Sequence, residues 1–500
     1  MAAPFPSRRQ SSPSQPEKGE LLISRDAHKS IVAGLIFSGI QSRWIRPRWD
    51  PKLHLAHPPS PADVEEMWDR YPEAAGCLIV SPTPYGTCAD IAAIAKICHA
   101  RGKPLVVAEA WGAHLPFHDD LPTWAMNPGA DIYVVSVHKM GAGFEQGSVH
   151  HLQGDRVDPA HLSACADLLM TTSPNAILYS AIDGWRRQMV QHGSELLGNA
   201  LALARKLRAD IDALAGIHVL EDELLAVESS HDLDRMQILM DLSGPGISGY
   251  QAADWLRENC RIDMGLSDHR RIMATLSMAD DDVAASRLMD ALGPLIGAAP
   301  TIAPAAPVDL PAPHELELET VVLPWDAFFG PAEDIPTRDA IGRVAAEQIT
   351  PYPPGIPAIV PGERTRLAYT STTAQKGCVL TLRLLTGTAT EIRPNRTHPR
   401  LLTKAPDVPD CTATWEQTRT AEMNPSPRNC ARRTATGMMG PDPGTGVGWR
   451  HQDACGGRRL TSKALRMFVF PPAAIGCRRR SDTGTYAGHE GLERNLGNRA

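Results

Sequence analysis

The sequence predicts an α/β protein whose first and largest domain is built on a mostly parallel sheet. Between Leu21 and Met170, short apolar runs alternate with amphipathic segments, as strands alternate with helices in sheets that are covered on both faces. The chain has 500 residues, of which 43% are hydrophobic, so it can bury the cores of two or three domains. We therefore expect a globular fold over much of the chain.

The elements of the first domain follow one another in a regular order. The apolar runs predict strands at Leu21–Ser24, Cys77–Ser81, Pro104–Ala108 and Ile132–Ser136. Apolar residues at helical spacing predict helices at Lys29–Ser38, Pro61–Tyr71 and Ala89–Ala100. In such sheets ligands gather at the carboxyl ends of the strands, so residues that directly follow a strand are the first candidates for a site.

A long predicted helix, Ala176–Leu214, leads into a second, smaller α/β domain. Its predicted strands are Ile217–Leu220, Gln237–Leu242 and Ile272–Ser277, and its predicted helices are Gly249–Asn259 and Asp281–Ile296. A linker rich in Pro and Ala follows at 297–313. We expect a disordered segment at 1–19, the large domain at 20–215, the small domain at 216–300, and the linker with a short C-terminal domain at 301–366.

The charges divide the chain into two unlike parts. Residues 367–500 carry 17 Arg and 3 Lys against 5 Asp and 5 Glu, a balance of +10, which leaves −17 for residues 1–366. The basic part is rich in Arg, Thr, Gly and Pro and has few apolar clusters, so it buries little surface. We expect this tail to be mostly disordered. It contains no recognisable nucleic-acid-binding module, so we expect no nucleic acid among the partners.

The sequence gives no indication of a membrane segment or of an oxidising compartment. It has no stretch of about 18 apolar residues, and residues 1–20 lack the apolar segment of a secretory signal. The ten cysteines form no CxxC pair and have no regular spacing, so neither a zinc ribbon nor a disulfide framework is indicated. We expect a soluble, cytoplasmic protein with reduced thiols and no membrane partner.

One segment, HLPFHDD at 114–120, has the side chains of a metal site. His114 and His118 have the spacing of ligands on one face of a helix, and Asp119 and Asp120 follow them. Pro116 stands between the two histidines and favours a loop instead. We therefore expect no bound metal.

The main chemical signal is SVHK at 136–139, directly after a predicted strand. A lysine in a partly desolvated pocket loses its proton readily and forms a Schiff base with an aldehyde. Taken alone, these four residues fit an ordinary surface lysine better than a reactive one.

Further motifs in the same order change that interpretation. They are RDAHKS at 25–30, SPTPYG at 81–86, EAWGAH at 109–114, SVHKMGAGFEQGS at 136–148, TTSPN at 171–175, HDLDRMQ at 231–237, GISGYQAADWL at 246–256 and PYPPGIP at 351–357. Through these motifs, residues 20–365 resemble the ornithine/lysine/arginine decarboxylases, a family of pyridoxal-phosphate (PLP) enzymes. The resemblance implies a transferase-like fold of type I, with PLP as the cofactor.

The resemblance also implies roles for residues at the candidate site. Lys139 would form the internal aldimine with PLP, and His138 would lie beside it and contact the phosphate or the substrate. Ser136 would bind the cofactor phosphate. We take Lys139 and His138 as the catalytic candidates.

Four more residues would surround the cofactor. His28 would stack on the pyridine ring, and Trp111 would line the pocket, although both side chains also suit a protein core. Thr172 and Ser173 resemble residues that reach the phosphate bound in the neighbouring subunit. The expected assembly is therefore a homodimer or a larger oligomer.

The sequence departs from the family at the residue that controls the pyridine nitrogen. The family keeps this nitrogen protonated with an aspartate near the end of the strand before Glu109, and this chain has Ala108 there. Alanine cannot pair with a pyridinium, so electron withdrawal by the ring should weaken. Glu109 is adjacent, but successive strand side chains point to opposite faces, so only a local irregularity would let it substitute.

Further departures lie at the two ends of the resemblance. Met1–Gly19 lacks the Gly-Thr-Ser loop that cradles the phosphate in the family, and the resemblance stops after Glu363. We interpret these differences as a reading frame altered at both ends or as real divergence.

The predicted function follows from this family resemblance. It is the decarboxylation of arginine, lysine or ornithine to the corresponding amine, with low activity in this chain because of Ala108 and the missing loop. The alternative is a catalytically dead protein that keeps the fold, either as a non-catalytic partner or without a function.

Overall fold

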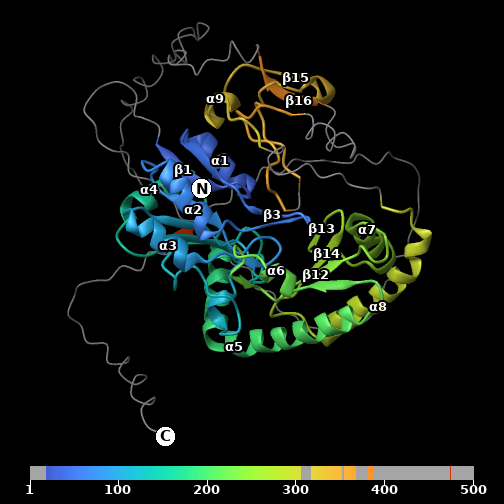
Figure 1. Cartoon of the computed structure of the whole chain (residues 1–500). Coiled ribbons are helices and arrows are strands. Elements are labelled where there is room, and N and C mark those ends of the chain that lie inside the picture. The colour runs from blue at the N-terminus through green and yellow to red at the C-terminus, as the bar shows by residue number, and fades with distance from the viewer. Residues whose placement is uncertain (1–18, 306–316, 352–353, 367–380, 387–472, 475–500) are drawn as a thin grey trace, which may run out of the picture. The chain divides into compact units, whose positions relative to one another are not determined.

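A computed structural model describes residues 19–305, 317–351, 354–366, 381–386 and 473–474 (Figure 1). These residues belong to one of two compact units of the chain, and the other unit, Asn395–Phe468, lies outside them. Apart from Gly19 and the two short pieces after residue 380, the segments that we expect to be disordered also lie outside the described residues.

A mostly parallel sheet forms the centre of the large domain, as predicted. It contains β1 (Glu20–Ser24), β2 (Gln41–Ile45), β5 (Cys77–Val80), β7 (Leu105–Ala108), β8 (Ile132–Ser136) and β9 (Ser148–Leu152). Their order is β9-β8-β7-β5-β1-β2, and only β9 runs antiparallel to its neighbour β8. The short strand β17 (Ala473–Ala474) pairs with β9. The four predicted strands are therefore the four central ones.

Helices bury both faces of this sheet, which explains why its central strands are almost continuously apolar. The helices of this domain are α1 (Lys29–Ser38), α2 (Pro61–Arg70), α3 (Ile91–Ala100) and α4 (Pro159–Leu169). Ile31 and Leu35 of α1 pack on one face, whereas Trp68 of α2 and Ile94 of α3 pack on the other. A capping box at Ser60 fixes the start of α2.

The long helix α5 (Ala176–Asp212) contributes to two cores, one with the large sheet and one with the small domain. The small domain has an antiparallel sheet of order β10-β12-β14-β13. Its elements are β10 (His218–Leu220), α6 (Asp222–Leu225), β12 (Gln237–Asp241), α7 (Gly249–Cys260), β13 (Leu266–Ser267), β14 (Arg271–Thr275) and α8 (Asp282–Ala298). The chain continues as a 3-10 helix at Ala299–Thr301, so the expected linker at 297–313 begins inside helical structure.

Two small ladders and a C-terminal module complete the described fold. The ladders pair β3 (Arg48–Asp50) with β4 (Leu55–His57), and β6 (Thr87–Cys88) with β11 (Asp232–Leu233). The C-terminal module contains α9 (Pro324–Phe328), β15 (Ala332–Pro336) and β16 (Thr381–Leu385). The strand β16 lies within 367–500, the stretch expected to be mostly disordered, and its Leu382 and Leu384 are buried.

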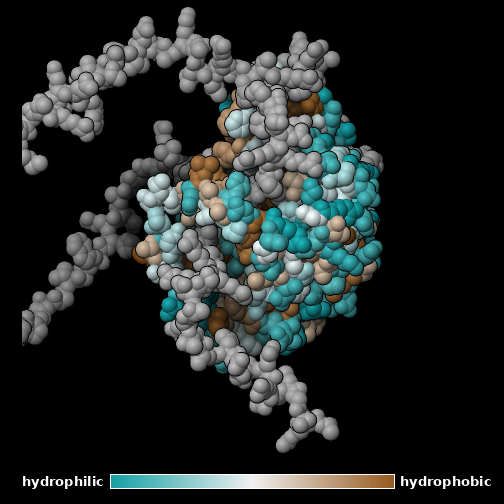
Figure 2. Space-filling view, turned by 90° about the vertical axis from the view of Figure 1, so that its left-hand side faces the viewer, coloured by the Kyte–Doolittle hydropathy of each residue, from teal (hydrophilic) through white to brown (hydrophobic). Residues whose placement is uncertain are grey.

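The face seen in Figure 2 is predominantly hydrophilic, with apolar areas that are small and separate. Among the helices of the described ranges, none is long and apolar enough to cross a membrane.

Candidate active site

Lys139 lies just beyond the carboxyl end of β8, in a tight turn. Its N–H donates to the Ser136 carbonyl at 3.1 Å, and the Gly143 N–H donates to the Val137 carbonyl at 3.0 Å. A Cβ atom on Gly141 or Gly143 would lie only 2.6 or 2.7 Å from atoms of Val137, so close approach requires glycine at both positions. The glycines thus let the chain turn directly after the strand, at the sheet edge where ligands gather.

The amine of the half-buried Lys139 lies against an aromatic ring. Its Nζ atom is 4.4 Å from the centroid of the Trp111 ring. Burial lowers the pKa of Lys139 to about 8, although the negative charge of Glu145 acts in the opposite direction. An ordinary lysine has a pKa of about 10.4, so Lys139 reaches its neutral, nucleophilic form at a much lower pH.

His28 lies near the same amine. It is the N-cap of α1, and its Nδ1 accepts the Ser30 N–H at 3.2 Å. Burial, together with the positive charges of Lys139 and Lys29, lowers the pKa of His28 to about 4. The structure therefore places a neutral imidazole, an indole and a partly deprotonated amine at one site.

Ser136 and His138 both precede Lys139 in the sequence, and the structure describes both. Ser136 is the half-buried last residue of β8. The Nδ1–H of His138 donates to the Gly147 carbonyl at 3.0 Å, which fixes the orientation of the ring. These positions fit the predicted contacts with the cofactor or substrate, which stay predictions.

Thr172 and Ser173 lie in an exposed loop between α4 and α5. The two helices on either side of this loop, α4 and α5, also expose large apolar side chains. Leu168 is 84% exposed, Ile177 71% and Val190 67%. No contact among the described residues joins Thr172 or Ser173 to Lys139, so a role for them at a neighbouring subunit's site stays a prediction.

Ala108 offers no polar group to a ligand. It is the last residue of β7, it pairs with Val80 and Val134 in the sheet, and its methyl group belongs to an apolar cluster with Val106. The position where the family resemblance implies a carboxylate is thus occupied by a buried methyl group.

Glu109 is committed to its own loop and does not replace the missing aspartate. Its Oε1 accepts the Ala125 N–H at 2.8 Å, and its side chain packs tightly against Gly112. Burial raises the pKa of Glu109 well above its usual value, although the Ala125 hydrogen bond acts against this. Glu109 is therefore engaged inside its own loop, in surroundings that disfavour its charged form.

Sequence reasoning missed the partner of His114. The sequence grouped His114 with His118 as possible metal ligands. In the structure the His114 side chain is buried, and its Nε2 lies 3.1 Å from Oδ2 of Asp234. Both residues are fully buried. No group of three side chains suited to a metal occurs within the described ranges. The two partners are far apart in the sequence, so no local pattern could have joined them.

Comparison with known proteins assigns the chain to a family. Residues 13–229 match the profile described as "Orn/Lys/Arg decarboxylase, major domain", and residues 323–374 match "Orn/Lys/Arg decarboxylase, C-terminal domain". An arginine decarboxylase of Halalkalibacterium halodurans is 34% identical over 355 residues, which cover 70% of this chain and 72% of the relative. The chain belongs to the Orn/Lys/Arg decarboxylase family. An arginine decarboxylase of Bacillus subtilis is 32% identical over 347 residues, covering 69% and 70% of the two chains.

Solved structures confirm the fold of this Orn/Lys/Arg decarboxylase family member. The constitutive lysine decarboxylase of E. coli has a TM-score of 0.60 and 17% identity, and the match covers 75% of this chain and 68% of that one. Lysine decarboxylase A from Pseudomonas aeruginosa also has a TM-score of 0.60, with 18% identity and coverage of 74% and 66%. At such identities the likeness concerns the fold alone. Members of the family depend on PLP.

Proposed function

We propose that this protein binds PLP through Lys139 and removes the α-carboxyl group of a basic amino acid. The observation that carries this proposal is the half-buried amine of Lys139, with its pKa of about 8, beside the Trp111 ring and near the neutral His28. Such an amine can attack an aldehyde at physiological pH, and the two flat side chains suit an aromatic ring. The residues present therefore fit the aldehyde end and the ring of PLP.

Within this proposal the protein supplies binding and orientation. PLP, when bound, supplies the electron sink that allows carbon dioxide to leave. Lys139 holds the cofactor and exchanges its amine with that of the substrate, whereas His28 and Trp111 shield the site from water. His138, fixed by Gly147, is a candidate to hold a proton or a substrate oxygen beside Lys139.

Arginine is the first substrate to test among arginine, lysine and ornithine. Relatives that are 32–34% identical to this chain carry the name arginine decarboxylase. The solved lysine decarboxylases share only 17–18% identity with it.

We further propose that turnover is slow, because Ala108 leaves the ring nitrogen without a carboxylate. A pyridine ring whose nitrogen is unprotonated withdraws electrons less strongly from the bond that must break. The same observation favours the second candidate function, a protein that binds the cofactor but does not catalyse the reaction.

The proposal includes a homodimer. The exposed apolar side chains of α4 and α5 lie on the two helices that flank Thr172 and Ser173. Burial of this surface by a second copy would explain its apolar character and would bring the exposed loop to a neighbouring subunit.

The decisive experiment traps the cofactor covalently. The full chain is incubated with PLP, reduced with borohydride and digested, and the modified peptide is identified by mass spectrometry. We expect the label on Lys139 and carbon dioxide release from arginine above the level of a Lys139→Arg control. A label on another lysine, or none despite bound PLP, would contradict the site assignment.

Ala108 is tested in the same preparation by Ala108→Asp, with Ala108→Asn as a matched neutral control. Removing one electrostatic stabiliser from an active site typically costs about 10²–10³ in rate, so we expect Ala108→Asp to raise turnover by at least about tenfold. Asparagine should not do so. If both variants bind PLP on Lys139 and neither turns over, the non-catalytic candidate is correct.

A further inference from the structure

The buried pair of His114 and Asp234 lies at one end of the loop that carries Trp111. This loop is short and closed by its own backbone, since the Gly112 N–H donates to the Glu109 carbonyl at 2.9 Å and the Leu115 N–H donates to the Gly112 carbonyl at 3.1 Å. Little freedom is left between the indole and His114. The position of Trp111 over Lys139 thus depends on where His114 is held.

The two buried side chains meet at one close contact. The Nε2 atom of His114 lies 3.1 Å from Oδ2 of Asp234, within the distance of an ion pair. Among the described residues, neither ring nitrogen of His114 nor Oδ2 of Asp234 has a well-aligned hydrogen bond. The approach of Nε2 to Oδ2 is therefore the contact that ties His114 to Asp234.

The surroundings of Asp234 stabilise its carboxylate. Burial on its own raises the pKa of Asp234, but contact with His114, the Met236 N–H and Gln237 more than offset this, so its pKa lies below the usual value. The Asp234 N–H also donates to the Gly86 carbonyl at 2.9 Å. These contacts favour the charged form of the carboxylate and fix the backbone at Asp234.

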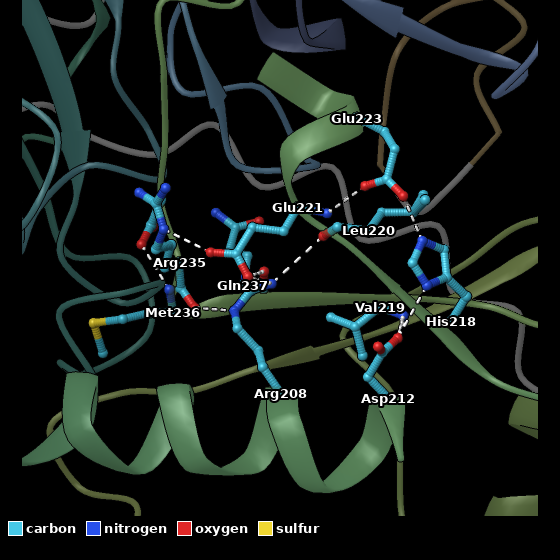
Figure 3. Close-up of polar contacts among 11 residues, drawn as sticks. Arg208, Asp212, His218, Val219, Leu220, Glu221, Glu223, Arg235, Met236 and Gln237 are labelled. Atoms are coloured by element: carbon cyan, nitrogen blue, oxygen red, sulfur yellow. Dashed lines mark hydrogen bonds and ion pairs between the residues drawn. The ribbon is translucent and has the colours of Figure 1, made fainter. Parts of the chain in front are cut away.

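Arg208 of α5 binds the residues that follow Asp234, and Figure 3 shows it reaching Arg235 and Gln237. The buried guanidinium donates to the Gln237 carbonyl at 2.7 Å and to the Arg235 carbonyl at 3.1 Å. Arg235 in turn donates to Glu221 at 2.7 Å. A continuous set of contacts therefore connects α5, through this turn, with His114.

We propose that the His114–Asp234 pair is a positioning device that holds the Trp111 loop closed over Lys139. Both residues act through the loop and touch neither cofactor nor substrate. The inference rests on the proposed function in one respect, because it takes Lys139 to be the reacting amine. If the pair is broken, the indole moves away, water reaches the amine, and the pKa of Lys139 rises toward the value of an ordinary lysine.

Two amide variants of His114 test this with matched chemistry. The amide nitrogen of His114→Gln occupies about the position of Nε2 and can still donate to Asp234, whereas that of His114→Asn is too short to reach it. The cofactor-free full chain is acetylated with a trace of acetic anhydride over a pH series, and the labelling of Lys139 is quantified by mass spectrometry. We expect a midpoint near 8 for the parent and for His114→Gln, and a midpoint above 9 for His114→Asn.

A second His–Asp pair provides the control for general destabilisation. His99 Nε2 lies 2.9 Å from Oδ2 of the buried Asp131, just before β8, at the end of that strand opposite Lys139. Asp131→Asn should lower the melting temperature and leave the Lys139 midpoint unchanged, whereas Asp234→Asn should change both. The proposal is overturned if folded His114→Asn keeps the parent midpoint, or if Asp131→Asn shifts it equally. If His114→Asn and Asp234→Asn do not fold, a shifted midpoint in folded His114→Gln also overturns it, and an unshifted one supports it.

The labelling is read without PLP and without substrate. A chain that fails to decarboxylate any amino acid therefore still gives a clear answer about the pair, and a failed positioning test leaves the decarboxylase proposal intact.

Discussion

At the scale of single residues, Lys139 is costly to the cofactor-free fold. A lysine whose pKa falls from about 10.4 in the unfolded chain to about 8 in the folded protein opposes folding while it is protonated. The penalty is complete below pH 8, where both states carry the proton. It fades as the pH rises from 8 to about 10.4, because only the unfolded state then retains the proton.

We therefore predict that Lys139→Met stabilises the cofactor-free protein. At pH 7 the gain in the free energy of unfolding should be up to about 3 kcal/mol, and it should shrink above pH 8. Thermal or urea unfolding of the two proteins over a pH series measures this. Lys96→Met, on the exposed face of α3, is the control and should change little. A destabilised Lys139→Met at pH 7 would show that the amine is better solvated than the structure indicates.

Only some residues of the candidate site could be predicted from the sequence. Lys139 and His28 could be predicted because each follows a strand within a recognisable motif, and the structure places both at one site with Trp111. The Asp234 partner of His114 could not, because the contact is made by folding and not by neighbours in the sequence. The orientation of Glu109 could not be predicted either. Only the structure shows that its carboxylate accepts a hydrogen bond from the Ala125 N–H, within its own loop.

At the scale of elements, the strands that could be predicted are the ones buried on both faces. The core strands β1, β5, β7 and β8 are apolar runs, whereas the outer β2 and β9 contain Gln, Arg or His and give no such signal. The ladders β3–β4 and β6–β11 have strands too short for any periodic pattern to show. Physical position in the sheet thus decides what the sequence can reveal.

A histidine at the turn of one of these unpredicted ladders contacts a histidine of the small domain. His54, at the β3–β4 turn, has a positive φ of 54°, and its Nδ1 lies 3.2 Å from Nε2 of His269 in the small domain. Burial lowers the pKa of both, the charges of Arg270 and Arg271 lower both further, and Asp268 acts against this on both. Asp50 also opposes the shift at His54. Folding therefore favours the neutral form of both histidines.

Acid should therefore release this hairpin. A histidine whose pKa is lowered by folding contributes fully to stability at pH values above its unfolded-state pKa of about 6.5. This contribution is lost as the pH falls below that value. We predict that hydrogen exchange within 48–57, corrected for its intrinsic pH dependence, accelerates between pH 7 and pH 5. His54→Asn, which tolerates the positive φ and does not titrate, should reduce that acceleration. Equal acceleration in the variant would rule out His54 as the cause.

At the scale of the whole molecule, the charge asymmetry predicts a change of character after residue 366, but it did not reveal β16. This strand, TLRLL, has only three apolar side chains, and it is stabilised by pairing with β15, which lies far away in the sequence. Such a non-local pairing leaves no local signal. The domain bounds beyond residue 366 therefore stay predictions except at this strand.

The described C-terminal residues are connected to the segment that carries His28. Arg25 donates to the Pro357 carbonyl at 2.7 Å and pairs with Glu363 at 3.1 Å, and the Lys29 N–H donates to the Gly355 carbonyl at 2.9 Å. Glu363 is almost completely buried. Arg25 and Lys29 flank His28 in the sequence, so these contacts support one wall of the site.

Breaking this connection should therefore loosen the cofactor site from a distance. Arg25→Met leaves the Glu363 carboxylate buried and unpaired, a change that costs about 3–5 kcal/mol in typical proteins, whereas Arg25→Met with Glu363→Gln removes the unpaired charge as well. We predict faster hydrogen exchange at 20–36 and weaker PLP binding in the single variant, with partial recovery of both in the double variant. Exchange mass spectrometry and a PLP titration of each protein test this. Unchanged exchange at 20–36 in the single variant would contradict this prediction. It would show that α1 keeps its position without the contact between Arg25 and Glu363.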